Sequence, residues 1–173
     1  MPDIIIRKER PGDEASIHNV TARAFEREGE AELVDKLRIS CPSSISYVAL
    51  YDGQIVGHIL FTPIVIQTKE RQVWGMALGP LAILPEYQNQ GIGSHLTIIS
   101  LEGIRQAGHP FVIVLGHPDY YPRFGFEKAS KYGITCQYAG VPDEAFMILV
   151  NNPQVLEGVS GIAKYLPEFD EVT

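Results

Sequence analysis

The sequence has little basic charge and no long hydrophobic run. Lysine and arginine number 14 against 21 aspartates and glutamates, which gives a formal net charge of −7. Proteins that bind nucleic acids carry basic patches that neutralise phosphates, so this balance predicts no nucleic-acid partner. No apolar stretch approaches the roughly 20 residues that a membrane-spanning helix needs. We therefore expect no membrane association.

Cysteine is also scarce. Cys41 and Cys136 are the 2 cysteines. Neither belongs to a Cys-x-x-Cys pair, and no cysteine and histidine stand at the spacing of a zinc site. The first residues lack the basic segment and the long apolar segment of a signal peptide. We expect two reduced thiols, no bound metal and a cytoplasmic location.

The length and hydrophobic content are typical of one globular domain. The chain has 173 residues, of which 45% are hydrophobic, enough for a sizeable core. We expect a single domain over residues 1–173, with its core at about residues 3–150. The tail at residues 151–173 is interrupted by glycine and proline, and its pattern assigns no element.

Hydrophobic periodicity predicts a mixture of strands and helices. Strands are expected at residues 4–6, 46–51, 55–66, 73–83, 111–115 and 146–150 and from Phe126 onward, and helices at residues 11–25, 30–37, 92–107 and 119–124. Asp52-Gly53 predicts a hairpin turn. The first four strands favour an antiparallel arrangement, whereas residues 73–115 favour a β-α-β unit. On the helix at 92–107, we expect Ile92, Leu96 and Ile99 to share the buried face.

The most informative segment is residues 88–93, Gln-Asn-Gln-Gly-Ile-Gly, between an expected strand and an expected helix. Backbone N–H groups in such a turn converge on one point, and the helix dipole adds partial positive charge there. The segment therefore predicts a site for a phosphate group. A Walker A loop would need lysine after Gly93, where Ser94 stands, and a Rossmann turn would need glycine in place of Leu96.

Two segments carry a resemblance to a known family. Residues 78–93, which end in Gln-x-x-Gly-x-Gly, and residues 120–126, Tyr-Tyr-Pro-Arg-Phe-Gly-Phe, resemble the acetyl-CoA signature and the tyrosine segment of the GNAT N-acetyltransferases. The resemblance covers about residues 3–150 and is strongest to small stand-alone bacterial acetyltransferases. It implies an α/β fold of the α+β type. The sheet would be mixed and mostly antiparallel, with splayed fourth and fifth strands and flanking helices.

The resemblance also implies a site for acetyl-CoA. The pyrophosphate would be held by Asn89, Gln90, Gly91, Ile92, Gly93 and Ser94, and the pantetheine amides would pair with Leu81, Ala82 and Ile83. Pro80 cannot donate to a sheet ladder, so it marks either the opening for pantetheine or an ordinary bulge.

By the same resemblance, Tyr121 matches the general acid, five residues before Phe126. The alternative is a tyrosine that only packs, which is the role we expect for Tyr120. No residue is identified as the general base. His117 is a candidate base or substrate contact, with a solvent-exposed turn as the alternative. Glu28, Glu30 and Glu32 lie where the resemblance places the first helices beside the acceptor pocket, but a solvated charged face is the role expected for them.

The resemblance implies transfer of an acetyl group from acetyl-CoA to an amine by direct attack in a ternary complex. The alternative function is a non-catalytic acyl-CoA-binding sensor or interaction module. The acceptor, a small-molecule or peptide amine, is not identified, although the acidic net charge weakly favours cationic amines. The oligomeric state stays open, with a homodimer among the options.

Overall fold

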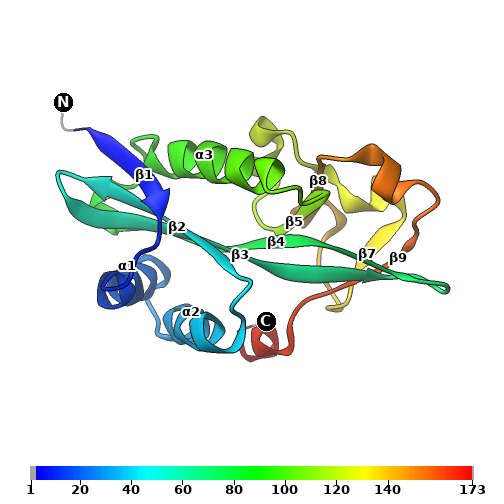
Figure 1. The fold of residues 1–173 in the computed structure, drawn as a ribbon, viewed down its shortest axis with the longest axis horizontal. Helices are drawn as coiled ribbons and strands as arrows, with labels where there is room; N and C mark the ends of the chain where they lie inside the picture. The colour runs from blue at the N-terminus through cyan, green and yellow to red at the C-terminus, as the bar shows by residue number, and fades with distance from the viewer. Residues whose placement is uncertain (1–2, 173) are drawn as a thin grey trace. The chain divides into compact units, whose positions relative to one another are not determined.

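The computed structural model describes residues 3–172, which form a β-sheet with three α-helices (Figure 1). The helices are α1 (Glu14–Phe25), α2 (Gly29–Ser40) and α3 (Ile92–Gln106). The strands are β1 (Ile4–Lys8), β2 (Ile45–Tyr51), β3 (Gln54–Gln67), β4 (Gln72–Ile83), β5 (Phe111–Leu115), β6 (Glu127–Lys128), β7 (Ile134–Cys136), β8 (Phe146–Val150) and β9 (Gly161–Lys164). Short 3₁₀ helices η1 (Pro85–Tyr87) and η2 (Tyr121–Phe124) flank segments considered below.

The sheet is mixed and mostly antiparallel, which confirms the predicted fold class. Its order is β1-β2-β3-β4-β5-β8-β6, and β9 pairs with β3 and with β7. Pairing is antiparallel at β1–β2, β2–β3, β5–β8 and β6–β8. The strands β4 and β5, which α3 connects, are parallel, so the predicted β-α-β unit is confirmed. The hairpin between β2 and β3 turns at Asp52 and Gly53, whose φ angles are +49° and +77°.

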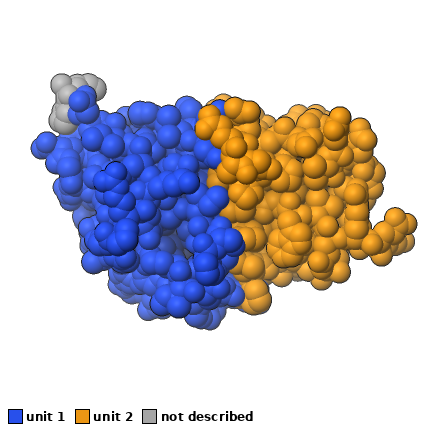
Figure 2. Space-filling view, viewed as in Figure 1, with its two compact units in different colours: residues 1–61, 79–103, 168–173 blue, residues 62–78, 104–167 orange. Residues whose placement is uncertain are grey.

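Contacts group the chain into two compact units (Figure 2). The first comprises residues 1–61, 79–103 and 168–173, and the second residues 62–78 and 104–167. The long strands β3 and β4 contribute residues to both units. The second unit has an apolar core that includes Phe111, Ile113, Phe146 and Ile148, all 4% exposed or less.

The buried face of α3 differs from the prediction at one residue. Ile92 and Leu96 are buried as expected, but Ile99 is 41% exposed. Two small polar residues, Thr97 and Ser100, are fully buried instead. Their hydroxyls donate to backbone carbonyls of the same helix, Thr97 to Gly93 at 2.7 Å and Ser100 to Thr97 at 3.2 Å. Each hydroxyl donates its hydrogen bond within the helix, so the buried face of α3 can hold these two polar side chains. Ile99 lies outside this face and is exposed to solvent.

A buried polar group lies in the first unit. His58 on β3 is fully buried, and its Nε2 lies 2.8 Å from the hydroxyl of Ser46 on β2. That hydroxyl donates its single hydrogen to Glu9 at 2.8 Å, so the hydrogen shared with the imidazole comes from Nε2. His58 is therefore neutral with its proton on Nε2. Burial lowers the pKa of His58 to about 4.

We expect the free energy of unfolding to decrease as pH falls from about 6.5 to about 4, because unfolded His58 binds a proton that the folded protein rejects. One such group contributes a slope of roughly 1 kcal/mol per pH unit. Urea unfolding at several pH values measures the slope. His58→Gln keeps a side-chain N–H donor but does not titrate, so its slope should be shallower. An unchanged slope in this variant would mean that other groups cause the loss of stability.

Candidate functional site

The segment between β4 and α3 forms a tight turn in the first unit. After β4 ends at Ile83, η1 leads into Asn89 and Gly91, whose φ angles are +62° and +84°. Glycine adopts a positive φ without steric cost, which explains its presence at position 91. A Cβ added to Gly91 would meet no atom within 4 Å, so the turn presents open backbone.

Glutamine side chains brace the turn, a role that the sequence interpretation did not assign. Gln88 donates from its amide to the carbonyl of Ile83 at 2.9 Å, and Gln90 donates to the carbonyl of Glu86 at 3.1 Å. Glu86 is exposed and forms an ion pair with Arg23 of α1. The glutamines of the motif thus have a structural function, since they tie the turn to the preceding backbone.

The start of α3 leaves backbone donors without helical partners. The amide of His95 donates to the carbonyl of Gly91 at 3.0 Å, which begins the helical pattern. The amides of Ile92 and Gly93 precede that bond, and no carbonyl within the helix accepts their hydrogens. Ile92 is buried at 4% exposure, so only its backbone can serve a ligand. The residues predicted for pyrophosphate binding, Asn89, Gln90, Gly91, Ile92, Gly93 and Ser94, therefore form one continuous turn suited to an anion.

The other predicted cofactor residues lie at the end of β4. Leu81, Ala82 and Ile83 follow the Gly79-Pro80 bond, which is cis. Ala82 is buried at 2% exposure, whereas its two neighbours are half-buried. In the second unit, the ladder between β4 and β5 joins residues 76–78 to residues 112–114 and so ends just before Gly79. The three predicted residues come after that ladder.

Tyr121 begins η2 in the second unit and is only 7% exposed. Its ring makes edge contacts with the rings of Tyr120 and Phe126, with centroids 5.0 Å and 5.6 Å apart. Gly116, just after β5, makes room for this ring, since a Cβ there would lie 2.4 Å from Cε2 of Tyr121. The sequence interpretation missed Gly116, and a glycine directly after a buried strand was the available signal.

Burial raises the pKa of the Tyr121 phenol well above its usual value, and the nearby Tyr120 raises it further. The phenol therefore stays protonated at neutral pH and can donate a proton but cannot act as a base. Tyr120 is half-buried, and the guanidinium of Arg123 lies 4.6 Å from its ring centroid. These contacts agree with the packing role expected for Tyr120.

The remaining candidates lie in different surroundings. The side chain of His117 is exposed, while its carbonyl accepts the amides of Tyr120 at 3.1 Å and Tyr121 at 3.4 Å. Glu30 does not belong to a solvated face, because it is 6% exposed and forms an ion pair with Arg27. That correction follows from its position on the side of α2 that carries the buried Leu33 and Leu37.

Neither a metal cluster nor a membrane helix is found in the described part of the chain. Among residues 3–172, no three histidine, cysteine, aspartate or glutamate side chains gather as a metal site. No helix within the same residues has the length and apolar character to cross a bilayer.

Comparison with known sequences gives a consistent set of relatives. The profile of the acetyltransferase (GNAT) domain matches residues 5–129. The Escherichia coli K12 protein YhbS, named an uncharacterized N-acetyltransferase, is 34% identical over 168 residues, which cover 96% of this chain and 99% of YhbS. YjhQ from the same strain, also named an uncharacterized N-acetyltransferase, is 40% identical over 135 residues, covering 76% of this chain and 74% of YjhQ.

Solved structures with bound ligand are similar over the whole chain. The complex of E. coli YhbS with CoA has a TM-score of 0.90 at 30% identity and covers 100% of this chain and 95% of YhbS. A GNAT family acetyltransferase from Brucella melitensis in complex with acetyl-CoA has a TM-score of 0.78 at 35% identity, covering 98% of this chain and 100% of that protein.

Proposed function

We propose that this chain, which belongs to the GNAT family of N-acetyltransferases, transfers an acetyl group from acetyl-CoA to a primary amine in a ternary complex. The observation that carries the proposal is the turn at residues 88–93, where open backbone with a positive φ at Gly91 precedes the amides that begin α3. Complexes of two relatives with CoA and acetyl-CoA support the same donor here.

In this proposal the turn holds the pyrophosphate of CoA. The amides from Asn89 through Ser94 supply the donors, and the dipole of α3 adds partial positive charge. The pantetheine arm pairs with the backbone of Leu81, Ala82 and Ile83 in the manner of an added strand. The carbonyl of Ile83 already accepts the amide of Gln88, which leaves it one further lone pair. The backbone of β4 therefore supplies the contacts to pantetheine without new side chains.

The chemistry needs a neutral amine and a protonated leaving group. The amine nitrogen attacks the thioester carbonyl, the carbon–sulfur bond breaks, and the amine loses a proton to solvent. A backbone amide of Leu81 or Ala82 stabilises the oxyanion of the tetrahedral intermediate. The phenol of Tyr121 gives its proton to the departing thiolate of CoA and then regains a proton from solvent. Burial raises the pKa of this phenol, so the phenol still carries its proton when the thiolate forms, although the same shift makes it a weaker acid.

We further propose that residues 1–173 act as one acetyltransferase domain in the cytoplasm. The family profile draws on residues of both compact units, which supports one functional domain. Cys41 and Cys136 are both free, which supports a reducing compartment.

The test is release of CoA thiol from acetyl-CoA across a panel of primary amines that includes polyamines, aminoglycosides and basic peptides. We expect steady release with at least one acceptor and a matching acetylated product. Tight binding of acetyl-CoA without release for every amine would favour the alternative of a non-catalytic acyl-CoA sensor. Absence of acetyl-CoA binding would reject both functions.

A further inference from the structure

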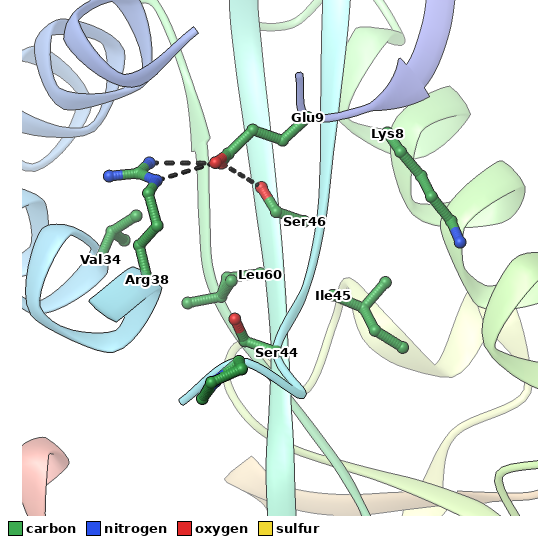
Figure 3. A pocket seen from close by; sticks show the side chains of 9 residues that line it. Lys8, Glu9, Val34, Arg38, Ser44, Ile45, Ser46 and Leu60 are labelled. Carbon is green, nitrogen blue, oxygen red and sulfur yellow. Dashed lines mark hydrogen bonds and ion pairs between the residues drawn. The ribbon is translucent and has the colours of Figure 1, made fainter. Parts of the chain in front are cut away.

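A pocket of about 280 Å³ lies between α2 and the first strands of the first unit. Its polar lining includes Glu9, Arg38, Ser44 and Ser46, and its apolar lining includes Val34 and Leu60. Figure 3 shows the side chains of Glu9, Arg38 and Ser46 pointing toward one another, while Lys8 points away. The turn and the tyrosine segment described above contribute no residue to this lining.

An ion pair forms one wall of the pocket. Arg38 donates to Glu9 twice, from Nε to Oε2 at 2.8 Å and from Nη2 to Oε1 at 3.2 Å. The two side chains are only 23% and 17% exposed. Burial opposes the charge on Glu9, but the hydrogen bonds from Arg38 and Ser46 outweigh it and hold the pKa of Glu9 below its usual value. Both groups are therefore charged at neutral pH.

Further hydrogen bonds fix the side chains of the ion pair. Ser46 donates to Oε1 of Glu9 at 2.8 Å and accepts from the buried His58 at 2.8 Å. Arg38 also donates from Nη1 to Asp35 at 3.1 Å. Each charged group is thus fixed by at least one further side chain, which is the preorganisation that a binding site requires.

Such a network is a costly way to close a gap between a helix and a sheet. A partly buried ion pair must offset the loss of its hydration, and apolar side chains of the same volume are often as stable or more so. Val34 and Leu60 beside the pair supply apolar surface of that kind. A charged wall beside an open pocket that is also lined by Val34 and Leu60 is therefore better explained by a ligand than by stability.

The wall has bonding capacity that the protein does not use. The guanidinium of Arg38 has five N–H groups, and three are engaged. Oε2 of Glu9 accepts one hydrogen bond and can accept another. The hydroxyl of Ser44 has no hydrogen-bond partner among residues 3–172. A ligand that fits must therefore bring a donor for Glu9 and an acceptor for Arg38 and Ser44.

We infer that this pocket binds a free α-amino acid with an aliphatic side chain such as that of leucine. The ammonium of the ligand contacts Oε2 of Glu9, its carboxylate contacts the free N–H groups of Arg38 and the hydroxyl of Ser44, and its side chain lies against Val34 and Leu60. A volume of about 280 Å³ is at the small end for ligand pockets and suits a molecule of this size.

The ligand is an effector and not the acetyl acceptor. An ammonium held against the carboxylate of Glu9 stays protonated, whereas the nitrogen that attacks a thioester must be neutral. The amino acid therefore leaves this pocket unmodified. The inference stands apart from the acetyl transfer proposed above, because neither the turn nor Tyr121 takes part in it.

Calorimetry with L-leucine on the full chain, in the absence of acetyl-CoA, tests the inference. We expect saturable binding with one site. Isopentylamine, which lacks the carboxylate, and 4-methylpentanoate, which lacks the ammonium, should each bind at least about tenfold more weakly, since each loses its hydrogen bonds to one of the two charged groups. Ser44→Ala should weaken leucine binding about threefold to tenfold through loss of one hydrogen bond.

The variant Ser44→Phe fills the pocket and should abolish leucine binding. Its matched control is Ser43→Phe, which adds the same bulk one residue away at an exposed position outside the lining. Thermal unfolding of both variants checks that they fold. If Ser44→Phe does not fold, Ser44→Ala still tests the inference. No leucine binding by the wild-type chain, or equal binding by Ser44→Phe and Ser43→Phe, would overturn the inference. Acetylation of leucine upon addition of acetyl-CoA would overturn the effector role.

Discussion

Replacing Tyr121 by phenylalanine is expected to lower the turnover number about 10²- to 10⁴-fold, the usual contribution of a general acid. The change removes one oxygen and leaves the ring that packs against Phe126, with centroids 5.6 Å apart. Loss of the phenol leaves the departing thiolate without a proton donor. The affinity for acetyl-CoA should stay close to that of the wild type, because the proposed contacts to the cofactor are made by other residues.

Steady-state kinetics with the best acceptor and calorimetry with acetyl-CoA measure the two quantities separately. The matched control is Tyr120→Phe, which removes a phenol from the neighbouring, half-buried tyrosine. That control should keep turnover within a few fold of the wild type. A Tyr121→Phe enzyme with wild-type turnover would show that this tyrosine only packs. Loss of turnover in Tyr120→Phe but not in Tyr121→Phe would show that Tyr120, not Tyr121, is the acid.

Replacing Gly91 by valine is expected to weaken acetyl-CoA binding at least about tenfold. Gly91 has a φ of +84°, and a left-handed conformation costs an L-residue roughly 1–2 kcal/mol, with a higher cost for β-branched side chains. The chain would relieve this strain by changing the turn, and the amides at the start of α3 would no longer converge on the pyrophosphate. Calorimetric titration with acetyl-CoA gives the affinity directly.

The control for Gly91→Val is Gly53→Val in the hairpin between β2 and β3. Gly53 has a similar φ of +77°, and a Cβ there also meets no atom within 4 Å. Both variants should lose comparable stability, but only Gly91→Val should lose acetyl-CoA affinity. Equal affinities for the cofactor in the two variants would remove the turn from the proposed binding site.

The sequence predicted most of the long elements, since their apolar periodicity is strong. The helix α3 and the buried strand β5, Phe-Val-Ile-Val-Leu, were expected at nearly their observed bounds. The strands β7 and β9 were not expected. Each has at most four residues, too few to establish an alternating pattern, and β9 lies in the tail that the pattern left unassigned. β9 pairs with β3 and with β7, so these strands depend on partners that are distant in the sequence.

Residues of the candidate site were predictable where local backbone geometry decides them. Gly91 indicates a turn before a helix, because few other residues tolerate its positive φ. The glycine directly after the buried strand β5 was a signal in the sequence, but the ring for which Gly116 makes room depends on how the following loop folds back. The burial of Glu30 was missed although its spacing places it on the same side of α2 as Leu33 and Leu37, because a glutamate is usually solvated.

The sequence by itself indicated the family, through the resemblance of residues 78–93 and 120–126 to its signatures. Local periodicity and the glycines of residues 88–93 also predicted the order of the main elements and a turn that suits a phosphate. Only the tertiary structure decided which polar groups are buried together. Glu9, Arg38, Ser46 and His58 stand far apart in the chain, and each alone is typical of a solvated surface. Strand pairing brings Ser46 opposite Leu60 and within reach of His58, and the packing of α2 adds Arg38 to the same wall. Long-range pairing and burial set the charge of such groups, and neither is written in the local pattern of the sequence.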